Sequence, residues 1–169
     1  MTTLIIGLGN PILGDDAVGW RVAEAVQRLL AETEPELAGA AEVDCVALGG
    51  LSLMERMVGY DRAIVIDALA SGGPPGVVSH CDLEALPDYS SFNSTAPHDA
   101  SLQTALRLGR AMGARLPEVV TVVGVEAERL YEFSEELTPA VAAAVPVAAR
   151  RVIDLLRSHS LEEQPHGVP

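Results

Sequence analysis

The chain has 169 residues, 49% of them hydrophobic, and this length predicts one domain that buries a core without disulfides or a structural metal. Its formal net charge is −13, from 11 basic and 24 acidic residues, which argues against binding to nucleic acid or to an anionic membrane. We see no bilayer-spanning apolar run and no secretory signal. Cys45 and Cys81 are the only cysteines and form no Cys-x-x-Cys pair, so we expect reduced thiols in a cytosolic protein.

Strand and helix patterns alternate along the chain. Apolar periodicity predicts helices over 17–30, from Ser52 to about Gly59, over Asp99–Met112 and from Thr138 to about Arg157. Five apolar runs predict strands, the fourth of them at an edge and open to an antiparallel orientation: Leu4–Gly7, Val43–Leu48, Ala63–Asp67, Val77–Asp82 and Val119–Val125.

Local signals refine these elements. Ser52 and Glu55 have the spacing of a capping box, and Thr138 before Pro139 is typical of an N-cap followed by proline at the first helical position. Pro146 is expected to kink or split the last helix. Residues 31–41 and 84–98 are predicted to be loops, and 158–169 a disordered polar tail.

This alternation predicts the fold class α/β. We expect a three-layer α/β/α sandwich with a twisted, mostly parallel sheet of about five strands, in a single domain over residues 1–157.

The sequence over 7–19, Gly-Leu-Gly-Asn-Pro-Ile-Leu-Gly-Asp-Asp-Ala-Val-Gly, joins the first strand to the first helix. Such a junction lies at the carboxyl edge of a parallel sheet, where ligands bind, and helix N-termini usually attract anions there. Here Asp15 and Asp16 supply negative charge, and Ile12 stands where a dinucleotide fingerprint needs its third glycine. The junction therefore suits a cation better than a nucleotide.

Three polar side chains are candidates for that edge. Asp16 begins the first helix, Asp67 ends the third strand, and His98 precedes the next helix. Two carboxylates and an imidazole suit a borderline divalent cation such as nickel or zinc, with an open position for water or substrate. Local roles compete with this hypothesis: Asp15, Asp16 and Asp99 as helix caps, Asp67 as a partner of loop amides, and His98 as an ordinary loop histidine.

The same motifs resemble the hydrogenase maturation endopeptidase family, over almost the whole chain. The resemblance rests on the motif over 7–19, Ala63-Ile-Val-Ile-Asp-Ala68, Pro97-His98, Val123-Gly-Val-Glu126 and Glu136-Leu-Thr-Pro-Ala-Val141. It implies an α/β/α fold of the phosphorylase/hydrolase-like kind. It also implies cytoplasmic removal of the C-terminal extension of a nickel–iron hydrogenase large-subunit precursor after metal insertion.

The resemblance further implies that Asp16, Asp67 and His98 are the catalytic and metal-recognising residues. The nickel is supplied by the precursor, and other divalent cations fit the same donors. Either the metal activates the attacking water, or it marks the substrate while Asp16 or Asp67 acts as general base. Glu126 either lines the cleft or is solvated.

Two alternative functions remain open at this stage. The chain is either a hydrogenase-assembly protein that binds without cleaving, or a peptidyl-tRNA hydrolase-like esterase, whose first motif also begins Gly-x-Gly-Asn-Pro. The esterase is disfavoured because no histidine precedes His80 and because the net charge suits tRNA poorly. A nucleotide-binding regulator is disfavoured by Ile12 and by the carboxylates at the helix start.

Overall fold

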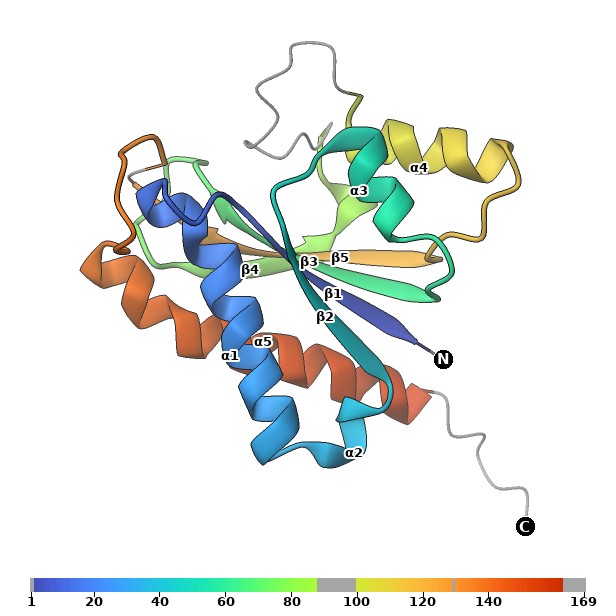
Figure 1. The fold of residues 1–169 in the computed structure, drawn as a ribbon, viewed down its shortest axis with the longest axis horizontal. Coiled ribbons are helices and arrows are strands. Elements are labelled where there is room, and N and C mark those ends of the chain that lie inside the picture. The colour runs from blue at the N-terminus through green and yellow to red at the C-terminus, as the bar shows by residue number, and fades with distance from the viewer. Residues whose placement is uncertain (1, 88–99, 129, 163–169) are drawn as a thin grey trace.

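A computed structural model describes residues 2–87, 100–128 and 130–162 of the chain. Its centre is one sheet of five strands in the order β2-β1-β3-β5-β4 (Figure 1). The first four strands in this order run parallel, and β4 pairs antiparallel with β5, so the reversed edge strand predicted at Val77–Asp82 is confirmed. The strands are β1 (Thr3–Leu8), β2 (Ala41–Val46), β3 (Arg62–Leu69), β4 (Val78–Asp82) and β5 (Val119–Glu126).

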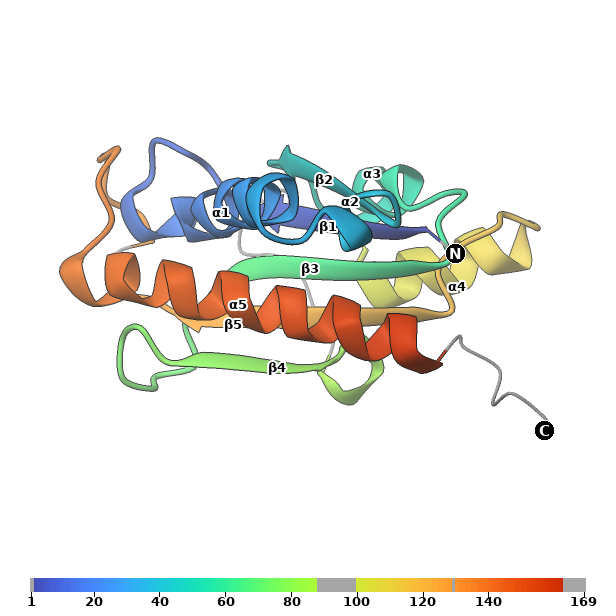
Figure 2. The ribbon, with the colours of Figure 1, turned by 90° about the horizontal axis from the view of Figure 1, so that it is seen from below.

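Helices cover both faces of this sheet. α1 (Val18–Glu32) and α5 (Pro139–Glu162) pack on one face, and α3 (Gly50–Arg56) and α4 (Leu102–Ala111) cover the other (Figure 2). The predicted three-layer α/β/α sandwich is therefore confirmed. The remaining elements are short: the 3-10 turns η1 (Gly14–Ala17) and η2 (Leu83–Ala85), and α2 (Pro35–Ala38).

The central strands are mostly apolar because each of their faces meets a helical layer. In β1, Ile5 belongs to the core under α1 and α5, while Leu4 and Ile6 belong to the core under α3 and α4. β3 alternates in the same way, with Ile64 and Ile66 facing the first of these cores. This alternation also fixes which layer Asp67 faces.

Two helix starts differ from the sequence prediction. α3 begins at Gly50 after Gly49 at the N-cap position, with no side-chain capping bond, so the capping box at Ser52 and Glu55 is wrong. α4 begins at Leu102, and the Ser101 hydroxyl accepts a hydrogen bond from the Thr104 amide at 3.2 Å. Ser101 is thus the N-cap residue of α4, whereas Asp99, the candidate cap, lies outside the described residues. The predicted loop over 31–41 also contains the helical turn α2.

The last helix tolerates its internal proline. α5 begins at Pro139 as predicted, but it continues unbroken through Pro146 to Glu162, so the predicted split is wrong and residues 158–162 are helical. An interior proline costs a helix about 3 kcal/mol, and burial of an apolar face offsets such a cost. The buried residues Val141, Ala148 and Val152 provide that face. Residues 163–169 of the predicted tail lie outside the described ranges.

Within those ranges, no helix combines the length and the apolar character that crossing a bilayer requires.

Candidate functional site

Two carboxylates lie at the carboxyl edge of the sheet, on neighbouring elements. Asp16 belongs to η1, which follows β1, and Asp67 lies near the end of β3. β1 and β3 are parallel neighbours, with Gly7 paired to Ile66, so both strands end at this edge. Asp16 is 2% exposed and Asp67 is fully buried. By strand alternation Asp67 faces the layer of α3 and α4.

The local bonds of the two carboxylates differ. Asp16 Oδ2 accepts a hydrogen bond from the Asn10 amide at 2.7 Å. Burial raises the pKa of Asp16 above its ordinary value, and the Asn10 hydrogen bond opposes this shift without cancelling it. Asp67 Oδ1 accepts from the Ala68 amide at 2.9 Å. Burial therefore outweighs the Asn10 hydrogen bond in setting the pKa of Asp16.

The glycines of the first motif place Asp16 by allowing backbone to meet backbone. A Cβ on Gly19 would lie 2.0 Å from the Leu8 carbonyl oxygen and 2.5 Å from that of Ile66. Gly9 has φ +142°, and a Cβ there would lie 1.9 Å from the Asp16 carbonyl oxygen. These glycines therefore allow the start of α1 to pack closely against the ends of β1 and β3. This close packing accounts for the positions of the glycines, and no bound phosphate is needed to explain them.

The backbone amides of this junction are occupied by the protein itself. The Gly14 amide donates to the Ser134 carbonyl at 2.7 Å, and the Asp16 amide donates to the Leu13 carbonyl at 3.1 Å. Asn10 contributes two further acceptors, its carbonyl for the Leu13 amide and its side chain for the Ile12 amide. A phosphate-binding loop needs such amides pointing at the ligand, so the nucleotide alternative is disfavoured.

Asp15 joins two parts of the chain that are far apart in sequence. Its carboxylate accepts hydrogen bonds from the Thr138 amide at 2.7 Å, the Thr138 hydroxyl at 2.9 Å and the Glu128 amide at 3.3 Å. Neither η1 nor α1 has a side-chain capping bond, so the predicted cap at Asp15 is wrong for its own helix. Asp15 instead holds the beginning of α5 against η1.

Glu126 also has a local structural contact that the sequence did not reveal. It is 5% exposed, and its carboxylate accepts from the Ser71 hydroxyl at 2.7 Å and from the amides of Gly72 and Gly73 at 2.9 and 3.1 Å. The side chain therefore holds the turn between β3 and β4 and is not solvated. The sequence signal was an acid at the end of a mostly apolar strand.

His98 and Asp99 lie outside the described residues, so the third member of the candidate site stays a prediction. Over residues 2–87, 100–128 and 130–162, no three His, Cys, Asp or Glu side chains are grouped so that they could hold a metal ion. Asp16 and Asp67 both lie buried at the carboxyl edge of the sheet, on η1 and β3.

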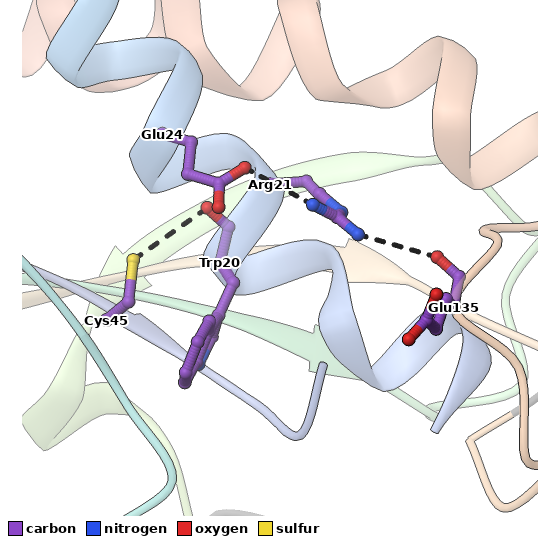
Figure 3. Close-up of polar contacts among 5 residues, drawn as sticks. All are labelled: Trp20, Arg21, Glu24, Cys45 and Glu135. Atoms are coloured by element: carbon purple, nitrogen blue, oxygen red, sulfur yellow. Dashed lines mark hydrogen bonds and ion pairs between the residues drawn. The ribbon is translucent and has the colours of Figure 1, made fainter. Parts of the chain in front are cut away.

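Neither cysteine is suited to be a nucleophile. Burial, followed by the charges of Glu24 and Asp44, raises the pKa of Cys45 to about 11. Its thiol donates to the Trp20 carbonyl oxygen at 3.9 Å (Figure 3). Burial raises the pKa of Cys81 as well. Because the thiolate is the reactive form, these shifts argue against a cysteine peptidase mechanism.

A pocket of about 310 Å³ opens beside η1 at the same edge. Three glutamates contribute to its wall, and Thr138, which binds Asp15, lies in it as well. The lining residues are Gly14, Glu128, Glu132, Ser134, Glu136, Leu137, Thr138 and Pro139.

Comparison with known proteins identifies the family. The sequence model of HycI, hydrogenase maturation protease, matches residues 20–155. The chain belongs to the hydrogenase maturation protease family. It is 32% identical over 167 residues to the hydrogenase 2 maturation protease of Escherichia coli, an alignment that covers 98% of this chain and 96% of that protein.

Solved structures of the family agree. The hydrogenase maturating endopeptidase HybD from E. coli superposes with a TM-score of 0.72 at 29% identity, over 94% of both chains. The hydrogenase 2 maturation peptidase from a Thaumarchaeota archaeon gives a TM-score of 0.62 at 27% identity, over 92% of this chain and 98% of that one. The predicted hydrogenase maturation endopeptidase family is confirmed, and the chain is an enzyme of the peptidase class.

Proposed function

We propose that this enzyme removes the C-terminal extension of a nickel–iron hydrogenase large-subunit precursor, and that it does so after nickel insertion. In this proposal Asp16, Asp67 and His98 recognise the nickel that the precursor carries. The metal is thus part of the substrate, and other divalent cations fit the same donors. Family membership supports the protease activity, and the buried carboxylate pair supports the recognition of a cation.

The burial of Asp16 and Asp67 is the observation on which the proposal rests. An ionised carboxylate is costly to bury unless an opposite charge or several hydrogen bonds compensate it. The raised pKa of Asp16 indicates that burial outweighs its bond from Asn10. A divalent cation bound by the two carboxylates would stabilise their charged forms. Carboxylate oxygens with an imidazole nitrogen are suitable donors for nickel.

The reaction is the hydrolysis of one peptide bond. The water oxygen bonds to the scissile carbonyl carbon, the C–N bond breaks, and a proton passes to the leaving amine. A carboxylate within reach of the water can accept its proton, and a raised pKa brings Asp16 closer to the range in which a general base works at neutral pH. The high pKa of Cys45 favours direct attack by water over a thioester intermediate.

The direct test uses the large-subunit precursor encoded by the same genome, prepared with and without nickel. Each form is incubated with the purified enzyme, and the products are weighed by mass spectrometry. We expect cleavage of the nickel-loaded form only, with loss of a C-terminal peptide. Equal cleavage of both forms would eliminate nickel gating, and binding without cleavage would identify a non-cleaving assembly protein.

Substitutions test two of these residues, His98 and Asp67, separately. His98→Ala and Asp67→Asn are expected to reduce cleavage of the nickel-loaded precursor by at least about a hundredfold, as is typical when a positioned catalytic group is lost. Matched controls are His80→Ala and Asp82→Asn, because both residues are exposed on the edge strand β4. Full activity of His98→Ala would remove His98 from the assignment.

A further inference from the structure

The loop between β5 and α5 exposes two large aromatic side chains. Phe133 is 85% exposed and Tyr131 is 74% exposed. The chain has only two phenylalanines and three tyrosines, so this loop exposes two of its five residues of these types. On the neighbouring loop Ile12 is 48% exposed. We call Ile12, Tyr131 and Phe133 the aromatic patch.

The aromatic patch lies at the same edge as the carboxylate pair. The Ser134 amide donates to the Ile12 carbonyl at 3.0 Å, and Leu13 forms a parallel β-bridge with Ser134. The segment around Phe133 therefore runs alongside the loop that leads from β1 into η1, where Asp16 lies. Both views of the ribbon show the orange loop before α5 beside the blue segment before α1 (Figures 1 and 2).

The loop that carries the patch is held in place at several points. Asp15 accepts hydrogen bonds from both the amide and the hydroxyl of Thr138, at the end of the loop. Arg21 on α1 donates to the Glu135 carbonyl at 3.5 Å (Figure 3). The Gly14 amide donates to the Ser134 carbonyl at 2.7 Å. Exposed apolar residues on a preorganised segment are typical of protein-binding surfaces, because ordering the surface costs little on binding.

The charge next to the patch indicates what kind of partner fits. Among the described residues that line the pocket beside η1, Glu128, Glu132 and Glu136 are acidic and none is a Lys or an Arg. A partner that presents an apolar side chain to the patch and a basic side chain to this pocket would be complementary in both polarity and charge.

We propose that the aromatic patch and the adjacent acidic pocket dock the hydrogenase precursor while Asp16 and Asp67 act on it. This inference rests on the proposed function. The partner surface is an apolar segment with a Lys or Arg that enters the pocket. Docking there places the precursor on the edge of the sheet that carries the carboxylate pair. The precursor is thereby recognised in two ways, through its metal and through its contact with the aromatic patch and the acidic pocket.

The test separates docking from chemistry. Single-turnover cleavage of nickel-loaded precursor is measured at increasing enzyme concentration, which yields a half-saturating concentration and a maximal rate. For the double variant Tyr131→Ser, Phe133→Ser we expect the half-saturating concentration to rise about tenfold or more, as for interface hot spots, with the maximal rate within about twofold. The matched control is Met112→Ser, since Met112 is 79% exposed after α4.

A second variant tests the charge of the pocket. Glu128→Gln with Glu136→Gln is expected to raise the half-saturating concentration and to flatten its dependence on salt. Thermal unfolding of each variant verifies that the variant remains folded.

Each outcome bears on one of the two proposals. If the wild-type enzyme leaves the precursor intact, the proposed function fails. If the wild type cleaves it and the aromatic double variant has an unchanged half-saturating concentration, the docking inference is overturned. A fall in maximal rate alone, or an equal effect of Met112→Ser, would overturn it as well.

Discussion

Replacing Asp15 tests whether this buried carboxylate holds α5 against η1. Asp15→Ala removes the acceptor of three hydrogen bonds, from the amide and hydroxyl of Thr138 and from the amide of Glu128. Hydrogen bonds to a charged group contribute about 1.5–3 kcal/mol each, and a buried donor left unpaired costs about 1–3 kcal/mol. Part of this is recovered by water at the nearby pocket, so we expect a loss of about 3–5 kcal/mol in the free energy of unfolding.

Urea unfolding of Asp15→Ala and the wild type measures this loss. For a chain of this length it corresponds to a fall of about 6–20 °C in Tm. Asp15→Asn retains one acceptor and is expected to lose less. Combining Asp15→Ala with Thr138→Ala gives a double-mutant cycle, in which we expect a coupling of about 1 kcal/mol or more because the hydroxyl bond is shared. A loss below about 0.5 kcal/mol for Asp15→Ala, or additive effects in the cycle, would refute the reasoning.

Three further substitutions follow from the same edge. Gly19→Ala puts a methyl group against the Leu8 carbonyl oxygen and is expected to cost at least about 3 kcal/mol in urea unfolding, whereas Gly39→Ala, which meets no atom within 4 Å, is expected to change little. Asp16→Asn is expected to abolish cleavage yet to raise Tm in the absence of metal at neutral pH. The pKa of Asp16 is raised by folding, so its ionised form destabilises the native state increasingly as pH rises through that pKa, and the gain in Tm should vanish in acid. Glu126→Ala is expected to lower the free energy of unfolding by about 2–4 kcal/mol. It should also speed hydrogen exchange of the Gly72 and Gly73 amides, which donate to Glu126 in the wild type. Unchanged exchange at these amides would contradict the contacts assigned to Glu126.

The sheet was predictable because its strands carry their own signal. Residues 63–66 of β3 are apolar at every position, which is expected only where both faces of the strand are covered. The edge strand was predicted from the glycine- and proline-rich turn before it, with its antiparallel orientation left open, and its half-exposed pattern in the structure agrees. Asp16 and Asp67 were assigned to one edge for the same reason, since the carboxyl ends of parallel strands lie together.

The contacts of Asp15 and Glu126 were not predictable from periodicity. Asp15 binds Thr138, 123 positions along the chain, and Glu126 binds a turn more than 50 positions before it. Local propensity reports on neighbours within one or two turns, so an acid near a helix start is first interpreted as a cap. The continuity of α5 through Pro146 was missed for a related reason, because the sheet face that stabilises it is distant in sequence.

Asp15 and Asp16 are adjacent in sequence, but the fold gives them different environments. Asp15 is satisfied by three donors from the β5–α5 segment, so its charge is compensated within the protein. Asp16 accepts a hydrogen bond from the Asn10 amide, and burial raises its pKa. A cation stabilises the charged form of a buried acid, because it replaces part of the hydration that the charge has lost. The two carboxylates of η1 therefore have different roles. Asp15 holds the loop that bears the aromatic patch, and Asp16 is available to bind the metal of the substrate.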